Sequence, residues 1–213
     1  MTVQLIHHRV TDPHSPEFEA LVAIYLAAHP ASERKPVTLL SAMAQRRDYL
    51  FLTVNLDEEV VGFSIVNLFP HLDASYLEYF AVAEDRRGQG IGQYLFRQIV
   101  EMREVAGRFM IVEVDSDKRP SSLQGDNTRR KRFYRNLGCK EVAGLDYRMP
   151  SITAHTPPPM DIMVYGSPLP GAVAKTRMRA WLEALYVGIY SMQATDTRIG
   201  QMLEDLPANL ELV

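Results

Sequence analysis

Apolar and polar residues change their spacing several times along the first half of the chain, and each change predicts a new element. Residues 2–9 are expected to form a strand, and Ser15-Pro16-Glu17 is expected to begin a helix because proline suits the first helical position. Pro36 is expected to begin a second helix. Apolar residues recur at intervals of three and four in both segments, at Phe18, Leu21, Val22, Tyr25 and Leu26 and then at Leu39, Leu40 and Met43.

Three strands are predicted next. The segments Tyr49–Leu56 and Val60–Leu68 are rich in β-branched and aromatic residues, and the polar Asp57-Glu58-Glu59 between them predicts an antiparallel hairpin. The third strand is expected at about residues 75–83. A glycine-containing segment then leads into an amphipathic helix whose apolar stripe consists of Ile91, Leu95, Ile99 and Met102, widened by Phe96 and Val100.

An apolar run from Phe109 to Val114 follows, and only Glu113 interrupts it. Such a run is typical of a strand buried on both faces. A polar loop at about residues 116–127 leads to a short helix that contains Phe133, Tyr134 and Leu137, and Gly138 ends this helix. This order of strands and helices predicts a mixed α/β fold.

The remaining residues are expected to extend this domain. We predict a domain over residues 1–150 and an extension over 151–213 that packs on it, with a proline-rich linker between them. The extension has a possible last strand at residues 160–165 and helices at about 172–192 and 195–205. The first of these helices has a wide apolar face formed by Met178, Trp181, Leu182, Leu185, Ile189 and Met192.

Composition narrows the possible functions. The 213 residues are 46% hydrophobic, enough for a packed core, and the net charge of -3 disfavours a nucleic-acid partner because such proteins are usually basic. The single cysteine, Cys139, allows no internal disulfide and no cysteine-based zinc site, and no metal site is predicted. No stretch reaches the ~20 apolar residues that cross a bilayer, and the N-terminus has no signal-peptide order. We therefore expect a cytoplasmic monomer or homodimer without a membrane partner.

Three glycines alternate at positions 88, 90 and 92, between a predicted strand and a predicted helix. Glycine tolerates positive φ, and a helix start presents unpaired N–H groups, so this turn suits a diphosphate, with Arg86 and Arg87 adding positive charge. The plain alternative is a turn that only packs closely. The Gly-x-Gly-x-Gly spacing matches neither the dinucleotide fingerprint nor the nucleotide-triphosphate loop, which disfavours a nucleotide-dependent enzyme.

Two motifs resemble those of the GNAT acetyltransferase superfamily. Arg87-Gly88-Gln89-Gly90-Ile91-Gly92 resembles its Arg/Gln-x-x-Gly-x-Gly/Ala coenzyme A motif, and the segment 77–82 resembles its fourth strand. The segment from Asn127 to Gly138 resembles its second motif, Asn-x-x-Ala-x-x-x-Tyr-x-x-Leu-Gly-Phe, with Arg130 in place of alanine and Cys139 in place of phenylalanine. The resemblance covers roughly residues 3–148.

The resemblance implies a splayed, mostly antiparallel sheet flanked by helices, and acetyl-CoA as co-substrate. The pyrophosphate would lie on the amides of residues 88–92, and the pantetheine arm would pair with the strand that ends at Val82, opposite the strand of Ile111–Val114. The donor contacts implied in this way are Phe80, Ala81, Val82, Arg87, Gly88, Gln89, Gly90, Ile91, Gly92, Asn127 and Arg130.

The resemblance also implies an acid, whereas the base stays open. Tyr134 occupies the position of the family's acid, a phenol that protonates the departing thiolate, although it could simply pack beside Phe133. Glu113 is one candidate base, because a buried carboxylate is costly unless it is paired or functional, and its Val-Glu-Val setting resembles the base-bearing strand of ribosomal-protein alanine acetyltransferases. Glu78 is the other, on one strand face with Phe80. The alternatives are a water relay in place of a side-chain base, or a structural role in which either glutamate pairs with an arginine.

The predicted function is transfer of an acetyl group from acetyl-CoA to a primary amine of a small-molecule or peptide acceptor by direct attack. A non-catalytic acyl-CoA sensor is the alternative. The basic run Arg129–Arg132 is expected to be a solvated helix start, or else to supply arginines to the coenzyme's 3′-phosphate or to an acidic substrate. Cys139 is expected to be a packed thiol rather than a nucleophile, and Glu33 either meets a cationic amine or lies in a surface turn.

Overall fold

The computed structural model describes residues 4–118, 123–151 and 156–213, and the chain divides into two compact units. The first unit comprises Met1–Leu68 and Ser75–Ala106, and the second comprises Phe69–Ala74 and Gly107–Val213. The predicted start of the first strand at residue 2 lies outside the described residues. Each unit combines an antiparallel sheet with helices, so the predicted mixed α/β fold is confirmed.

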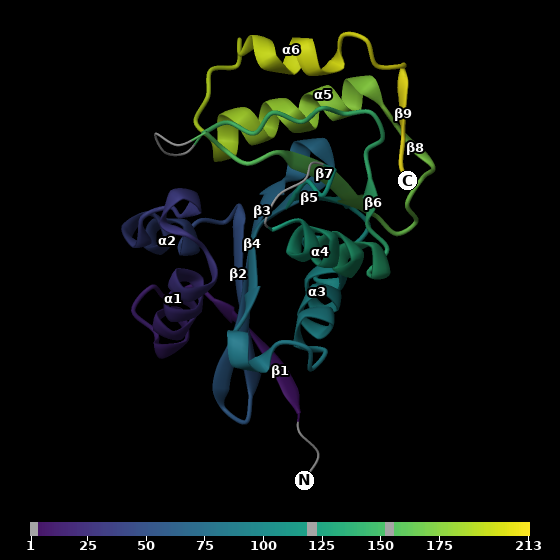
Figure 1. Cartoon of the computed structure of the whole chain (residues 1–213). Helices are drawn as coiled ribbons and strands as arrows, with labels where there is room; N and C mark the ends of the chain where they lie inside the picture. Colours follow the sequence, from purple (N-terminus) through teal and green to yellow (C-terminus); the bar gives the residue numbers. More distant parts are fainter. Residues whose placement is uncertain (1–3, 119–122, 152–155) are drawn as a thin grey trace. The chain divides into compact units, whose positions relative to one another are not determined.

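The first unit is a four-stranded sheet with helices on both faces (Figure 1). Its strands occur in the spatial order β1 (Leu5–Val10), β2 (Tyr49–Leu56), β3 (Glu59–Phe69) and β4 (Ala74–Val82). Both β1 with β2 and β2 with β3 are antiparallel. The helices are α1 (Pro16–Ala28), α2 (Val37–Ala44) and α3 (Ile91–Glu101), with short helical turns at Ala31–Glu33 and Glu84–Arg86.

Local chemistry explains where α1 begins and where the chain turns between β2 and β3. The Ser15 hydroxyl accepts a hydrogen bond from the Phe18 amide at 3.2 Å and caps α1, whose first residue is Pro16. In the β2–β3 hairpin, Asp57 and Glu58 have φ values of 48° and 71°. Two consecutive left-handed residues match the twist of a tight hairpin, and β3 therefore begins at Glu59, the residue that the sequence had placed in the turn.

The strands alternate their side chains between two buried layers in this unit. One layer packs α1 and α2 on β2, β3 and β4, with Phe18, Leu21, Tyr25, Leu40, Met43, Phe51, Phe63, Ile65 and Tyr79 among its members. On the other side of the sheet lies α3, whose buried stripe is Ile91, Leu95, Phe96 and Ile99. Met102, which was expected in this stripe, follows the last residue of the helix.

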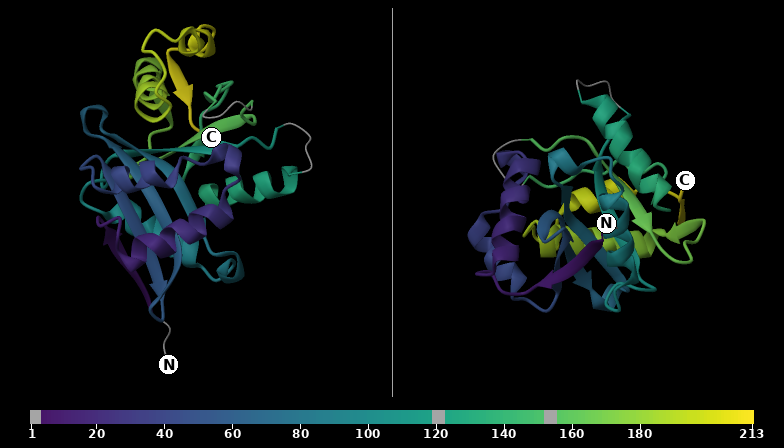
Figure 2. Two further views of the ribbon diagram at one scale, coloured as in Figure 1. Left: turned by 90° about the vertical axis from the view of Figure 1, so that its left-hand side faces the viewer. Right: turned by 90° about the horizontal axis from the view of Figure 1, so that it is seen from below.

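The second unit contains two antiparallel sheets and the C-terminal helices. The larger sheet has the order β5 (Phe109–Asp115), β7 (Met160–Tyr165) and β6 (Lys140–Glu141), and the smaller pairs β8 (Ala172–Ala174) with β9 (Asn209–Glu211). The helices are α4 (Gln124–Asn136), α5 (Lys175–Ala184) and α6 (Thr197–Leu203). Figure 2 shows α5 and α6 running beside each other next to β9.

Two expectations for the second unit were wrong in extent. The helix expected to reach residue 192 ends as an α-helix at Ala184 and continues as a π-helix over Leu185–Ile189, where the Tyr190 amide bonds to the Leu185 carbonyl at 3.1 Å. Ser191 then adopts a left-handed φ of 56°, so Met192 lies outside the helix. In addition, α4 begins at Gln124, within the segment expected to be a loop.

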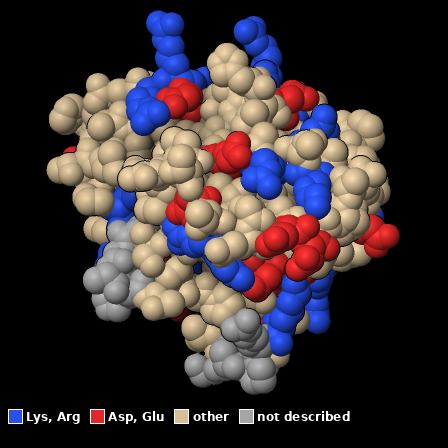
Figure 3. Space-filling model, turned by 90° about the horizontal axis from the view of Figure 1, so that it is seen from above, with Lys and Arg blue, Asp and Glu red and all other residues tan. Residues whose placement is uncertain are grey.

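No helix in the described ranges is both long and apolar enough to cross a bilayer. On the face drawn in Figure 3, basic and acidic side chains lie interspersed. The exposed pair Arg129–Asp126, with 3.1 Å between Nη1 and Oδ1, is one example of such mixing.

One member of the basic run is not solvated. Lys131 is 1% exposed, and its Nζ lies 2.7 Å from Asp117, 2.8 Å from Glu141 and 2.7 Å from Asp161. Lys118 adds a second cation, at 2.7 Å from Glu141 and 2.8 Å from Asp161. The expectation of a solvated helix start therefore fails at this position. Burial alone would raise the pKa of Glu141 and Asp161, but the two lysines outweigh it and hold both values below normal.

We predict that Lys131→Met destabilises the second unit strongly. Removal of one partner of a buried ion pair costs about 3–5 kcal/mol because the remaining charges are left uncompensated. The free energy of unfolding from urea titration measures this loss. Arg132→Met is the matched control, since Arg132 is exposed on the same helix, and it should change stability by less than about 0.5 kcal/mol. Equal effects of the two substitutions would contradict a stabilising role for the buried cluster.

Candidate functional site

The turn before α3 leaves its backbone open to solvent. Gly88 and Gly90 both have φ of +79°, and a Cβ atom added at either would meet nothing within 4 Å. Gly90 is the N-terminal cap of α3, and no side chain makes a capping hydrogen bond there. The first amides of a helix have no intrahelical partners, so this helix start can accept an anion from outside the protein.

The arginines beside this turn are not equivalent. The Arg86 guanidinium lies 2.8 Å from Glu59 Oε2 and 3.4 Å from Asp85 Oδ2, so its charge is compensated. Arg87 Nε donates to the Val82 carbonyl at 3.3 Å, which ties the turn to the end of β4, and the residue is exposed. Of the two arginines expected to add positive charge, Arg87 is the one without a carboxylate partner within salt-bridge distance among the described residues.

The end of β4 depends on a glycine that sequence reasoning missed. A Cβ atom at Gly62 on β3 would lie 3.0 Å from the Ala81 carbonyl oxygen and 3.1 Å from Val54 Cγ1. The Ala83 amide also bonds to the Val61 carbonyl at 2.9 Å. A larger residue at this position would therefore push β3 away from the strand that carries Phe80, Ala81 and Val82. Glycine inside a strand is the sequence signal for such a close approach.

Glu78 lies on β4, two residues before Phe80, and has a cation as partner. Its side chain is 3% exposed, and Oε1 accepts a hydrogen bond from the Lys35 ammonium, whose side chain is 12% exposed. The Tyr49 hydroxyl on β2 also faces the carboxyl group. The other oxygen, Oε2, is buried and has no hydrogen-bond partner among the described residues. Burial raises the pKa of Glu78, and the opposing effects of Lys35 and Tyr49 only partly offset this.

Two tyrosines position the segment that carries Lys35. Tyr25 on α1 donates its hydroxyl to the Lys35 carbonyl at 3.1 Å, and Tyr79 on β4 donates to the Glu33 carbonyl at 3.1 Å. Their rings meet edge to face with 4.9 Å between centroids. Only Glu33 in this segment was singled out from the sequence, and neither Lys35 nor Tyr49 was recognised.

Tyr134 is buried on α4 in the second unit. Its side chain is 7% exposed, and the centroid of its ring lies 5.1 Å from that of Phe133. Burial raises the pKa of the phenol. Cys139 is 2% exposed, and burial raises the pKa of its thiol to about 12. Such a thiol is almost entirely protonated at neutral pH and is a poor nucleophile.

Asn127 and Arg130, the two donor contacts implied by the second motif, have partners inside the second unit. Asn127 donates its side-chain amide to the Ser116 carbonyl at 3.2 Å, which holds the start of α4 to the segment after β5. Arg130 is exposed and pairs with Asp115 at the end of β5. Both contacts explain how α4 is fixed beside β5.

Glu113 on β5 is held by two phenols that the sequence did not reveal. Tyr147 donates its hydroxyl to Oε1, and Tyr190, immediately after the π-helix, donates to Oε2. Tyr147 is buried, and burial with the neighbouring carboxylate raises its pKa. Both oxygens of Glu113 are therefore engaged by residues far away in the sequence, and periodicity gives no signal for such contacts.

The predicted catalytic and donor-binding residues thus fall into two sets, one in each compact unit. The first unit contains Glu78 and the candidate donor contacts on β4 and in the turn: Phe80, Ala81, Val82, Arg87, Gly88, Gln89, Gly90, Ile91 and Gly92. The second unit contains Glu113, Asn127, Arg130 and Tyr134, on β5 and α4. No group of three or more His, Cys, Asp or Glu in the described parts of the chain has an arrangement suited to a metal ion.

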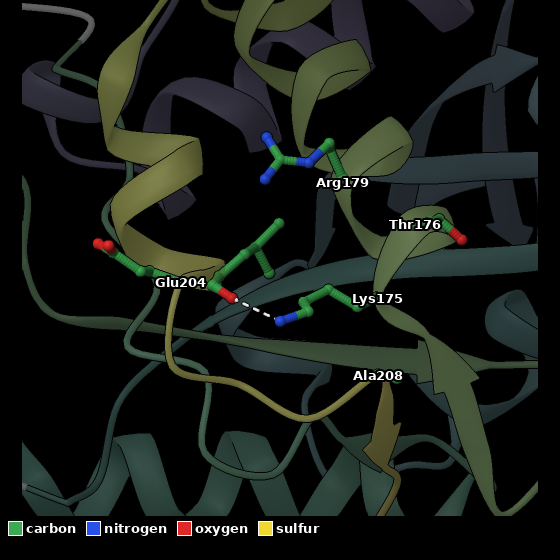
Figure 4. Close-up of a pocket in the computed structure, with 6 residues that line it drawn as sticks. Lys175, Thr176, Arg179, Glu204 and Ala208 are labelled. Atoms are coloured by element: carbon green, nitrogen blue, oxygen red, sulfur yellow. Dashed lines mark hydrogen bonds between the residues drawn. The ribbon is translucent and has the colours of Figure 1, made fainter.

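A separate hollow lies in the C-terminal part of the second unit (Figure 4). Its volume is about 320 Å³, and Lys175, Thr176 and Arg179 from the start of α5 line it together with Glu204 after α6. Lys175 donates to the Leu203 carbonyl at 3.1 Å, so its ammonium is part of the wall. None of the predicted catalytic or donor-binding residues lines this hollow.

Comparison with known proteins bears on the family and the fold of this chain. The model of the acetyltransferase (GNAT) family matches residues 18–139, more than half of the chain. A search of curated proteins gives no match. Among solved structures, a protein from Bacteroides thetaiotaomicron assigned to the GNAT family aligns over 88% of this chain and 99% of its own, with a TM-score of 0.72 and 19% identity.

Two further solved structures share the fold. The ribosomal-protein-S18-alanine N-acetyltransferase of Escherichia coli has 18% identity and a TM-score of 0.56, over 76% of this chain and 94% of its own. A diaminobutyrate acetyltransferase from Paenibacillus lautus, solved with L-2,4-diaminobutyric acid and coenzyme A, has 14% identity and a TM-score of 0.57, over 77% and 95%. The family match and the shared fold agree, and the chain belongs to the GNAT family of acetyl-CoA-dependent acetyltransferases.

Proposed function

We propose that this acetyltransferase moves the acetyl group of acetyl-CoA to a primary amine of a small-molecule or peptide acceptor. The observation that carries this proposal is the open helix start at Gly90, in the turn after the strand that carries the buried carboxylate of Glu78. Two solved relatives are named for acceptors that carry amino groups, diaminobutyrate and a ribosomal-protein alanine. Both likenesses lie below 20% identity and leave the acceptor of this chain to experiment.

The residues of the turn fit a diphosphate. The exposed backbone from Arg87 to Gly90 has no Cβ or capping side chain in the way, and the start of α3 adds its partial positive charge. Arg87 adds a full charge. Acetyl-CoA supplies an activated thioester, and the extended backbone at Phe80, Ala81 and Val82 is proposed to align the arm that carries it.

Glu78 is the better candidate for the base. Its Oε2 has no hydrogen-bond partner among the described residues and can accept a proton, and burial raises the pKa of the carboxyl group, which makes it a stronger base. Glu113 has both oxygens engaged by tyrosine hydroxyls, Tyr147 on Oε1 and Tyr190 on Oε2, so each oxygen already has a donor within the protein. We therefore assign proton acceptance to Glu78 and a structural role, fixed by its two tyrosine partners, to Glu113.

Tyr134 is proposed as the acid that protonates the leaving thiolate. Its phenol keeps its proton at neutral pH because burial raises its pKa. A thiol titrates near 8.5, so a thiolate can take the proton only if the phenol is placed to give it in the transition state. The alternative of a non-catalytic acyl-CoA sensor needs neither Glu78 nor Tyr134.

Gly90→Ala should weaken acetyl-CoA binding. The substitution costs about 1–2 kcal/mol at a left-handed φ, and its methyl group would occupy the open space proposed for the diphosphate. We expect the KM for acetyl-CoA to rise about tenfold. Gly171→Ala is the control, because Gly171 also faces open space and does not have a positive φ, and its KM should not change. Equal KM values in the two variants would refute the proposed diphosphate site.

Glu78→Gln should lower turnover without weakening the donor. Loss of a general base costs about 10²–10⁴-fold in kcat, while the turn that holds acetyl-CoA is untouched. Thiol release from acetyl-CoA, followed with a panel of primary amines, measures this. Glu59→Gln is the control, since Glu59 is an exposed carboxylate paired with Arg86. If Glu113→Gln abolishes turnover and Glu78→Gln does not, the base is misassigned, and if no amine releases thiol, the sensor alternative is favoured.

Tyr134→Phe should lower kcat about 100-fold, within the usual contribution of a general acid. Phenylalanine keeps the ring contact with Phe133 and removes only the hydroxyl. The loss should be smaller with an acetyl thioester whose leaving thiol is more acidic, because a better leaving group needs less protonation. Tyr94→Phe on α3 serves as a control for removal of a partly exposed hydroxyl. A uniform loss with both donors would show that the hydroxyl acts only in packing.

A further inference from the structure

Lys35 places a primary amine on the carboxylate that we assign as the base. The chain has five lysines, and the other four have different surroundings. Lys118 and Lys131 lie in the carboxylate cluster of the second unit, and Lys140 and Lys175 donate to backbone carbonyls. Lys35 alone among them bonds to Glu78. Its ammonium thus occupies a position from which an amine can lose a proton to this carboxylate.

The backbone of Lys35 is held so that its side chain reaches inward. Its carbonyl accepts the Tyr25 hydroxyl, and the preceding Glu33 carbonyl accepts the Tyr79 hydroxyl. Pro36 follows as the N-terminal cap of α2, with φ of -56°, and restricts the chain on the other side. A lysine fixed in this way loses little further entropy on reaching the reactive position, which favours an intramolecular reaction.

Glu78 and the strand proposed to align the donor belong to the same unit. Residues 78 and 80 lie on the same face of β4, because side chains alternate along a strand, and two residues span about 7 Å. The side chain of Lys35 is only 12% exposed, which limits competition from solvent. A purely structural ion pair would be expected to satisfy both carboxylate oxygens, whereas Oε2 of Glu78 has no hydrogen-bond partner among the described residues.

We propose that Lys35 is a self-acetylation site, an inference that rests on the proposed function of Glu78. The Lys35 ammonium gives one proton to Glu78, and the neutral amine attacks the carbonyl carbon of the acetyl thioester. The C–N bond forms, the C–S bond breaks, and the thiolate leaves with the electron pair. A second proton leaves the nitrogen as the amide forms, so the products are acetyl-lysine, coenzyme A as the thiol and one proton. Acetylation removes the cation that balances Glu78.

The test uses the full chain and isotopically labelled acetyl-CoA, without an added amine. Peptide mass spectrometry follows label at all five lysines against time. We expect label at Lys35 at a first-order rate that does not depend on protein concentration. Lys140 is exposed and reports the non-enzymatic background. Label at Lys35 no faster than at Lys140, or a rate that rises with protein concentration, would overturn the proposal.

Two variants separate this inference from the proposed function. Glu78→Gln should slow labelling of Lys35 at least about 100-fold, whereas Glu59→Gln should leave it unchanged, and circular dichroism checks that both fold. Lys35→Arg should abolish labelling at position 35, and the labelling of the other four lysines should not increase. If added amines are acetylated while Lys35 is not, the inference fails and the proposed function stands. Labelling of Lys35 without turnover of any amine supports the inference and argues against a separate acceptor.

Discussion

A carboxylate can stay in a protein interior only if something compensates its charge, and this constraint shapes both compact units. In the first unit Glu78 is balanced by Lys35 and faces Tyr49. In the second, Lys118 and Lys131 balance a cluster of acidic side chains at the end of β5 and on β6 and β7. The first arrangement leaves one carboxylate oxygen unbonded among the described residues, and the cluster engages all three acids. This contrast separates a candidate reactive site from a stabilising one.

The two candidate glutamates show how surroundings divide roles between similar groups. Glu78 is raised in pKa by burial and faces one ammonium. Glu113 accepts hydroxyl donors on both oxygens, one of them from the residue after a π-helix. π-Helices are rare and often occur at functional positions. The C-terminal segment therefore contributes directly to the surroundings of Glu113 on β5, through the Tyr190 hydroxyl.

Much of the local architecture could be predicted because it depends on near neighbours. The helix at Pro16, the hairpin of β2 and β3 and the strand Met160–Tyr165 follow from proline, turn residues and apolar runs. The turn at residues 88–92 was recognised because glycine spacing is itself local. Prediction failed where a distant residue decides the outcome. The π-helix interrupts an ideal apolar stripe, and Lys131 looks solvated until three acids from other segments surround it.

The sequence by itself determined the mixed α/β elements and the glycine turn before α3, because these follow from spacing along the chain, and its two motifs resemble those of the family that the comparison then showed. Only the tertiary structure decided which groups surround each glutamate. Lys35 and Glu78 are separated by 43 residues, and Tyr190 and Glu113 by 77. Proton affinity depends on burial and on charges within a few ångströms, and those distances exist only after the chain has folded.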